Sequence, residues 1–420
     1  MLSKILQYRD NRIVKNLSFL GIIQFTNYLL PVITLPYLVN KLGSLNFGVL
    51  SFSQAYANYY MLVLDYGFNL SITRQIARER ADKDKLDQIF SQAIVTKLAI
   101  LAVLVIVFLP TLFLFDVFKD YTYLYILSFS AISFQSFFPI WFFQGMERMQ
   151  YITYLNVGLK LLYTILIFTF VRSQTDFYLV PLFNCVLYFT VFITSVNIII
   201  RKFGVKFRKV GWSDIKVQLK DGWYVFTSAF LGGFLSTSGT FFLGIFAGKE
   251  IAGIYASIEK LVRAFLSLFS PVNQALYPYV CGKFSISDEE GLNAVKKTGK
   301  YIVLFAFAVC VVLIIASPLI IRIIYNSGLS EYAIILKLLS VWALFSIFNN
   351  ILGYQILIAS NRSNIYFRFF LISSIISTVL FFVFTRHFQY YAITIGMLLG
   401  ESLMTVMMFR YIKKTFSKIV

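Results

Sequence analysis

The sequence predicts an all-α, polytopic membrane protein with about 12 transmembrane helices. Of its 420 residues, 59% are hydrophobic and 14% are charged, whereas a soluble domain is about 45–50% apolar and about 25% charged. The apolar residues form continuous runs long enough for the roughly 20 residues that span a bilayer. These runs lack the alternation of a transmembrane strand. A water-soluble enzyme and a β-barrel are therefore excluded.

The apolar segments that predict these helices follow one another along the whole chain. They cover residues 17–39, 46–67, 91–115, 121–143, 151–171, 177–200, 223–247, 251–280, 300–325, 331–359, 364–386 and 390–411. The first segment follows a charged start and is longer than the core of a signal peptide, so we expect it to be retained.

The distribution of basic residues predicts the topology. With the N-terminus in the cytoplasm, the great majority of Lys and Arg fall in cytoplasmic segments, among them the basic linker 201–221. This bias follows the positive-inside rule and predicts that both termini are cytoplasmic. It accounts for the net charge of +19 without a nucleic-acid partner, and part of it can hold anionic membrane lipids.

The linker 201–221 also divides the chain near its middle, between the sixth and seventh segments. This position predicts one six-helix lobe over residues 1–205 and a second over residues 206–420. Because each half has the same even number of spans, both halves enter the membrane in the same direction. They would then be related by a pseudo-twofold axis along the membrane normal.

A weak internal repeat supports the division into halves. Gly43 and Gly48 precede one apolar helix, and Gly248 and Gly253 precede another at the same spacing in the second half. The alternative explanation is that short loops often contain glycine. We favour a common origin of the halves because the basic linker is also central.

Cysteine and histidine are too few for a metal or redox site. The three cysteines, Cys185, Cys281 and Cys310, are scattered, which excludes a disulfide framework and a CxxC metal site. The single His387 excludes a histidine-based zinc or di-iron centre. The phosphate-binding pattern GxxxxGK(S/T) is absent, so ATP is not the direct energy source unless a partner protein supplies it. The sequence therefore predicts no catalytic residue, no metal and no cofactor.

Several charged residues lie at membrane depth inside the apolar segments. A charge at the bilayer centre costs at least about 2.5–3.5 kcal/mol, so such side chains should face a bundle interior or a wet cavity. The rise of about 1.5 Å per residue puts Arg263 and Glu401 near the midplane, and Lys160 deep in its own segment. Glu259 lies one turn before Arg263 and can pair with it, whereas Lys260 points about 100° away from Glu259.

Other charges have simpler explanations. Lys97 and Arg368 lie within two turns of the predicted cytoplasmic edge, where long basic side chains can snorkel to the surface without any function. Asp65 lies near the inner end of the second segment. For Glu259, neutralisation of Arg263 is the structural alternative to a role in ion coupling.

The basic residues at membrane depth outnumber the acidic ones, which predicts a cavity that attracts an anion. Phosphate suits such a cavity because the planar guanidinium of arginine can bind two oxygens at once. Asn58 lies among Tyr56, Tyr59 and Tyr60, whose rings could stack on sugars. Packing is the alternative role for each of these rings.

Four motifs stand out along the chain. They are Asp65-Tyr-Gly-Phe-Asn-Leu-Ser-Ile-Thr-Arg74, Trp141-Phe-Phe-Gln-Gly-Met-Glu147, Tyr255-Ala-Ser-Ile-Glu-Lys-Leu-Val-Arg263 and Pro271-Val-Asn-Gln-Ala-Leu-Tyr-Pro278. These motifs resemble the bacterial O-antigen and polysaccharide-repeat flippases of the Wzx (RfbX-like) family. The resemblance covers nearly the whole chain in length, predicted spans and order of motifs. This family belongs to the multidrug/oligosaccharidyl-lipid/polysaccharide exporter superfamily.

The resemblance implies two six-helix lobes around a central cavity in the bacterial inner membrane. The cargo would be an undecaprenyl-diphosphate-linked oligosaccharide that moves from the cytoplasmic to the periplasmic leaflet by alternating access. Related proteins are thought to couple transport to a proton or sodium gradient. The family also implies a polysaccharide polymerase and a chain-length regulator as partners.

The charged residues can be assigned roles on this hypothesis. The candidate substrate-binding residues are Arg263, Lys260, Lys160, Lys97, Arg368 and Asn58. Arg74 and Arg78 would collect the headgroup at the cytoplasmic entrance, while the polyprenyl tail stays in lipid. The candidates for binding the coupling cation are Glu259, Asp65 and Glu401.

Three other kinds of protein remain as alternatives. A membrane-embedded polysaccharide polymerase or glycosyltransferase usually needs a sizeable outer loop with catalytic Asp, Glu or Arg, and the outer loops predicted here are only a few residues long. A drug/cation antiporter of the same superfamily would prefer an acidic cavity, whereas the predicted one is net basic. A lipid II flippase is also conceivable, but that group usually carries additional spans.

Overall fold

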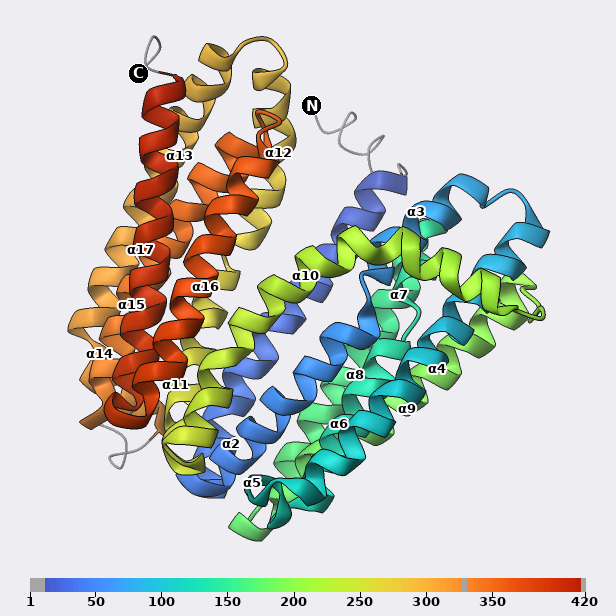
Figure 1. The fold of residues 1–420 in the computed structure, drawn as a ribbon, viewed down its shortest axis with the longest axis horizontal. Coiled ribbons are helices and arrows are strands. Elements are labelled where there is room, and N and C mark those ends of the chain that lie inside the picture. Colours follow the sequence, from blue (N-terminus) through green and yellow to red (C-terminus); the bar gives the residue numbers. More distant parts are fainter. Residues whose placement is uncertain (1–11, 326–330, 417–420) are drawn as a thin grey trace, which may run out of the picture. The chain divides into compact units, whose positions relative to one another are not determined.

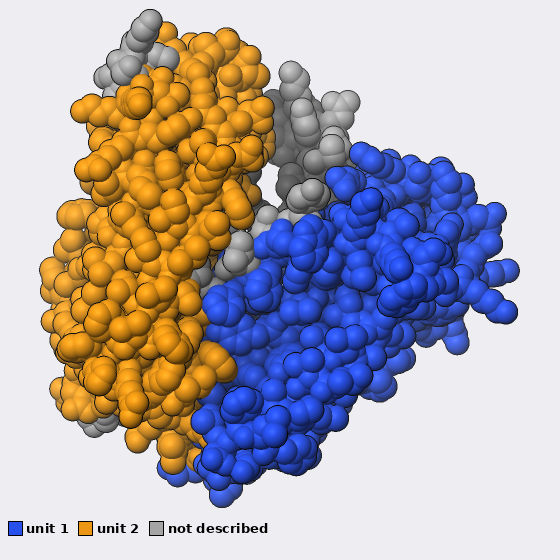
Figure 2. Space-filling view, viewed as in Figure 1, with its two compact units in different colours: residues 1–42, 49–237 blue, residues 43–48, 238–420 orange. Residues whose placement is uncertain are grey.

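The computed structural model describes residues 12–325 and 331–416, and every regular element within these ranges is helical (Figure 1). The two chain ends, on which the predicted cytoplasmic termini depend, lie largely outside the described residues. The chain packs into two compact units, which Figure 2 shows in different colours. Unit 1 comprises residues 1–42 and 49–237, and unit 2 comprises residues 43–48 and 238–420. The predicted lobe boundary at 205/206 stays a prediction.

Unit 1 is built from the first helices of the chain. They are α2 (Arg12–Asp65, except its residues 43–48), α3 (Phe68–Glu79), α4 (Lys83–Leu114), α5 (Asp116–Lys119), α6 (Thr122–Phe137), α7 (Ile140–Gly145), α8 (Met149–Phe170), the 3₁₀-helix η1 (Gln174–Tyr178), α9 (Leu179–Phe203) and the first part of α10 (Trp212–Phe246).

Unit 2 contains the end of α10 and all later elements. They are α11 (Lys249–Ser267), α12 (Ser270–Phe284), α13 (Asp288–Ile315), α14 (Ser317–Tyr325), α15 (Ala333–Asn349), the π-helix η3 (Asn350–Ile358), α16 (Ser363–Phe388) and α17 (Tyr390–Thr415).

The long helices confirm a polytopic membrane fold. Within the described residues, 9 helices are long and apolar enough to cross a membrane, or 10 if the bent pair Val225–Phe234 and Ser236–Phe246 forms one span. The expected number of about 12 is not confirmed. One counted helix, Gly21–Glu79, covers two predicted segments on either side of a break at Gly43. The predicted segment 251–280 is not among the counted helices, because α11 carries several charged residues.

The paired glycines adopt matching backbone conformations. Gly43 has φ 75° and ψ 167°, and Gly248 has φ 96° and ψ 158°, a region that only glycine enters readily. Gly48 and Gly253 allow two helical segments of unit 2 to touch. A Cβ atom on Gly48 would lie 1.8 Å from the Lys249 carbonyl oxygen, and one on Gly253 would lie 2.5 Å from Gly48 Cα. The matching conformations are what the predicted repeat requires.

Two of the motifs that carry the family resemblance pack against each other in unit 1. Helix α3 follows a turn in which Gly67 has φ 69°, and helix α7 contains the fully buried Trp141. Thr73 Oγ1 on α3 donates a hydrogen bond to the Trp141 carbonyl at 3.2 Å. A Cβ atom on Gly145 would lie only 2.6 Å from Ile76 Cγ2. The two motifs are therefore one packed structural feature.

Replacement of Gly48 tests the close helix contact. We expect Gly48→Ala to lower the free energy of unfolding by about 1–3 kcal/mol, because the added methyl group would overlap backbone atoms. The matched control is Gly158→Ala on α8, where an added Cβ has nothing within 4 Å and alanine favours the helix. Melting temperatures in detergent measure both variants, and an unchanged value for Gly48→Ala would contradict the contact.

Candidate functional site

The predicted pair of Glu259 and Arg263 is present on α11. Arg263 donates from Nε and Nη2 to Glu259 Oε1, at 2.9 and 2.7 Å. The Glu259 side chain is 8% exposed, whereas that of Arg263 is 36% exposed. The carboxylate is thus enclosed by protein, while the guanidinium reaches a more open environment. The pairing expected from helical spacing is confirmed.

Neighbouring helices of unit 2 complete the surroundings of this pair. The guanidinium carbon of Arg263 lies 5.4 Å from the ring centroid of Trp342 on α15, a distance at which a cation is attracted to an aromatic face. Thr240 Oγ1 on α10 donates to Glu259 Oε2 at 3.4 Å. Both carboxylate oxygens of Glu259 therefore have donors, which lowers the cost of burying its charge.

Glu401 on α17 is held by Asn349, the last residue of α15. Asn349 Nδ2 donates to the Glu401 carboxylate and, at 2.9 Å, to the Glu401 backbone carbonyl. Thr405 Oγ1 donates to Asn349 Oδ1 at 2.7 Å and fixes the orientation of the amide. Arg263 also interacts electrostatically with Glu401. We call Glu259, Arg263, Asn349 and Glu401 the unit 2 charge cluster.

The backbone directly after Asn349 is π-helical, over Asn350–Ile358. Such segments are rare and often occur at functional sites. Gln355 Nε2 donates to the Asn273 carbonyl on α12 at 3.2 Å. In the part of the chain that the structure describes, Asn350 Oδ1 and Gln355 Oε1 are buried without a hydrogen-bond partner. A water molecule or a ligand that donated a hydrogen bond to these oxygens would lower the cost of burying them.

The sequence reasoning missed Trp342, Asn349 and the π-helix. The sequence could have singled out Asn349 as a candidate, since Asn349 and Asn350 are adjacent polar residues inside the apolar segment 331–359. Nothing in the sequence pattern distinguishes Trp342 from the other aromatic residues of that segment.

The other predicted cations of unit 2 lie outside the charge cluster. Lys260 is exposed, and its Nζ atom lies 5.1 Å from the ring centroid of Phe47. Its orientation agrees with the expectation that it does not share Glu259 with Arg263. Arg368 is exposed on α16.

Unit 1 contains a second ion pair, between Asp65 at the end of α2 and Lys97 on α4. Lys97 Nζ lies 3.4 Å from Asp65 Oδ1 and donates to the backbone carbonyl and the Oγ atom of Ser136 on α6. Ser136 Oγ donates in turn to Asp65 Oδ1 at 2.5 Å. The Lys97 side chain is only 1% exposed, so it does not snorkel. Each member of this trio contacts the other two.

Lys160 lies on α8 in a polar stretch of unit 1. Asn156 and Thr164 stand one turn to either side of it, and Asn27 is on α2, which packs along α8. In the described ranges, Asn27 Oδ1, Asn156 Oδ1 and Thr164 Oγ1 are buried without a hydrogen-bond partner. This stretch therefore offers acceptors at membrane depth in addition to the ammonium group.

The remaining predicted residues of unit 1 lie apart from both groups. Asn58 is half-buried on α2. Arg74 and Arg78 are exposed one turn apart on the same face of α3. The predicted site residues thus fall into one cluster in unit 2, one ion pair in unit 1 and several separate positions. Their proposed roles in binding and ion coupling stay predictions.

Comparisons with known proteins agree with the fold and the motifs. The family described as "Polysaccharide biosynthesis protein" matches residues 13–281. A protein of Escherichia coli (strain K12) named "Putative O-antigen transporter" is 27% identical over 400 residues, which cover 95% of this chain and 96% of that protein. A protein of Shigella dysenteriae with the same name is 26% identical over 407 residues, covering 95% of this chain and 100% of that protein.

Two solved structures share the fold. An inward-facing multidrug resistance MATE family transporter of the MOP superfamily superposes with a TM-score of 0.66 at 15% identity, covering 96% of this chain and 98% of that one. The lipid II flippase MurJ in an inward closed conformation gives a TM-score of 0.67 at 15% identity, covering 96% and 90%. At this level of identity the likeness concerns the fold alone.

The ion pair of unit 1 can be tested by its effect on stability. We expect Lys97→Met to lower the free energy of unfolding by about 3 kcal/mol, because Asp65 loses its cation inside protein. The double variant Lys97→Met/Asp65→Asn should recover most of that loss, since it leaves no unpaired charge and keeps an oxygen for Ser136. Melting temperatures in detergent give the double-mutant cycle. Additive effects of the two substitutions would contradict the pairing.

Proposed function

Because the chain belongs to the polysaccharide biosynthesis protein family, we propose that it is a flippase for an undecaprenyl-diphosphate-linked oligosaccharide. The cargo, an O-antigen or capsular repeat unit, moves from the cytoplasmic to the periplasmic leaflet of the inner membrane by alternating access. The protein spans the bacterial inner membrane several times, and both of its termini lie in the cytoplasm. A polymerase and a chain-length regulator would act on the delivered units.

The environment of Arg263 is the observation that supports this proposal most. Its guanidinium lies inside an apolar bundle, is oriented by Glu259 on α11 and lies near the ring of Trp342, yet 36% of its side chain remains exposed. A planar guanidinium fixed in this way suits a phosphate, because it can offer two parallel donors. The aromatic neighbour suits the face of a sugar ring.

The charge balance of the cluster suggests how cargo binding is linked to an ion. With both carboxylates ionised, Glu259 and Glu401 outnumber the single cation of the cluster, Arg263. A diphosphate that binds Arg263 adds negative charge beside Glu259, which costs free energy where water is scarce. Uptake of a proton or a sodium ion by Glu259 or Glu401 removes that cost, so the two binding events are linked.

The residues of unit 1 have complementary roles in the proposal. Arg74 and Arg78 attract the anionic headgroup at the cytoplasmic surface, and Lys160 with its neighbouring acceptors contacts the sugars or the diphosphate. Lys97 and Asp65 keep the end of α2 in place, since each already satisfies the other. Asn58 contacts the glycan by hydrogen bonds.

Substitution of Arg263 tests the binding role. In a strain that lacks the gene, wild type should bring single lipid-linked repeat units to the outer leaflet, and Arg263→Gln should leave them on the cytoplasmic side. The double variant Arg263→Gln/Glu259→Gln leaves no unpaired carboxylate at this position and should fail equally at normal protein level. Arg322→Gln on α14, exposed in the same unit, is the matched control.

The same assay separates the rival functions. Full translocation by Arg263→Gln would refute the role of this residue. In the strain without the gene, repeat units that reach the outer leaflet but never join into chains would identify a polymerase instead. Normal surface polysaccharide in that strain would point to another exporter.

Substitution of Glu259 tests the ion linkage. In proteoliposomes, we expect Glu259→Gln to translocate lipid-linked glycan at a rate that an imposed proton or sodium gradient no longer stimulates, because the neutral side chain cannot bind the ion. Glu250→Gln is the control, since Glu250 lies on the same helix and accepts a hydrogen bond from Ser44 Oγ at 2.7 Å. Stimulation equal to that of wild type would exclude Glu259 as the ion site.

A further inference from the structure

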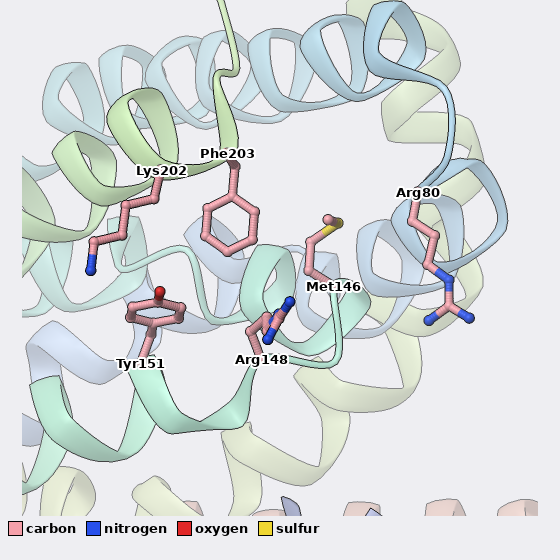
Figure 3. Close-up of a pocket in the computed structure, with 6 residues that line it drawn as sticks. All are labelled: Arg80, Met146, Arg148, Tyr151, Lys202 and Phe203. Carbon is pink, nitrogen blue, oxygen red and sulfur yellow. The ribbon is translucent and has the colours of Figure 1, made fainter. Parts of the chain in front are cut away.

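A cavity of about 360 Å³ lies at one end of unit 1, apart from the residues proposed above to hold the cargo. It is lined by Arg80, Met146, Arg148, Tyr151, Lys202 and Phe203 (Figure 3). These residues come from the segment after α3, the connection from α7 to α8, the start of α8 and the end of α9. Several parts of the chain thus contribute to one concave surface, and its volume lies within the roughly 300–1,000 Å³ of small-molecule sites.

The lining of the cavity is cationic. Three of its six residues are basic, and the acidic residue beside them is Glu147, whose Oε1 atom pairs with Arg80 Nη1 at 2.7 Å. In the described part of the chain, no carboxylate forms an ion pair with Arg148 or Lys202. The cavity with Glu147 therefore carries a net positive charge of two, which matches a ligand with two negative charges.

The backbone at Glu147 turns its two neighbours into the cavity. Glu147 has φ 55°, a left-handed conformation that residues other than glycine rarely adopt. Met146 and Arg148, on either side of it, both line the cavity. Strain of this kind persists where the surrounding structure holds it, and it is concentrated at functional sites.

Aromatic rings form one wall of the cavity. Lys202 Nζ lies 5.4 Å from the ring centroid of Tyr151, and the rings of Tyr151 and Phe203 pack at 5.9 Å in an edge-to-face arrangement. Figure 3 shows Tyr151 between Lys202 and Arg148, with the ring of Phe203 facing the same space. The cavity thus combines cations with an apolar surface, as an amphipathic ligand requires.

The position of the cavity relates it to the membrane surface. Helix α8 begins at Met149 and helix α9 ends at Phe203, and both helices lie in segments that are long and apolar enough to cross a membrane. Their ends therefore lie near the boundary between lipid and water, where tyrosine and basic residues bind lipid headgroups. A ligand in this cavity can keep its phosphate among the cations and its hydrocarbon chain in the bilayer.

We propose that this cavity binds the diphosphate headgroup of a prenyl lipid. Two negative charges match the net charge of the lining better than the single charge of a common phospholipid, and a guanidinium with a nearby ammonium can bind several phosphate oxygens. The cavity would hold the lipid carrier at the surface before or after its passage. The inference rests on the proposed function for the identity of the lipid, whereas the charge and shape of the cavity support binding by themselves.

Binding of farnesyl diphosphate to the purified full chain in detergent tests the proposal. We expect Arg148→Gln/Lys202→Gln to weaken binding at least tenfold, and each single variant to weaken it by a smaller factor. The matched control is Arg201→Gln, an exposed cation next to Lys202 that does not line the cavity, and it should stay within twofold of wild type. Unchanged affinity in the double variant, with a melting temperature like that of wild type, would overturn the proposal.

Competition distinguishes the possible sources of the phosphate. Phosphatidylglycerol and inorganic pyrophosphate should each displace farnesyl diphosphate only at concentrations at least tenfold higher, because the first has one charge and the second has no hydrocarbon chain. Equal displacement by phosphatidylglycerol would assign the cavity to ordinary phospholipid, and equal displacement by pyrophosphate would assign it to a soluble anion. Either result would overturn the assignment to a prenyl diphosphate.

The binding assay involves no translocation, so it is independent of the proposed function. A chain that binds farnesyl diphosphate through Arg148 and Lys202 but does not translocate glycan would support the cavity and refute the flippase. A chain that translocates glycan but binds equally well without these two cations would refute the cavity alone.

Discussion

Charges inside this apolar bundle need compensating partners, and this requirement governs how its helices are aligned. An unpaired charge surrounded by lipid or protein costs several kcal/mol, and Lys97, Asp65 and Glu401 have partners on neighbouring helices. In unit 1, Lys97 joins α4 to Asp65 on α2 and to Ser136 on α6. In unit 2, Asn349 joins α15 to Glu401 on α17. These contacts fix how the helices align, because apolar packing alone tolerates small shifts along a helix axis.

The partners and the exposure of each charged side chain distinguish charges that stabilise the fold from charges that are available to a ligand. Lys97 is enclosed and bonded to two partners, so its charge is used within unit 1. Arg263 is also paired, but its partner Glu259 lies on the same helix and its guanidinium remains partly exposed beside Trp342. An intrahelical pair can be loosened without moving a helix. This difference favours Arg263 over Lys97 as the residue that meets a diphosphate.

The backbone departs from regular α-helix next to Asn349, where the π-helix begins. Irregular backbone at membrane depth is tolerated only where protein or a wet cavity satisfies its polar groups. A cation lies beside an aromatic ring in each unit: Arg263 beside Trp342 in unit 2, and Lys202 over Tyr151 at the cavity of unit 1. Each place combines a positive charge with an apolar surface, which suits a ligand with both a phosphate and an apolar part.

The membrane fold and the contacts within single helices could be predicted from the amino-acid sequence. Long apolar runs require helices that cross the bilayer, and a spacing of four residues put Glu259 beside Arg263, because helical geometry is local. The first glycine of each pair, Gly43 or Gly248, also marked a place where the helical backbone breaks, since positive φ selects glycine. The expected number of 12 spans stays unconfirmed, since α11 carries too many charges to be counted among the helices apolar enough to cross a membrane. The contact of Lys97 with Asp65, that of Asn349 with Glu401 and the cavity shared by Arg148 and Lys202 could not be predicted in this way. The residues of each pair are distant in the chain, and only the packing of helices, which depends on the shapes of all side chains at once, brings them together.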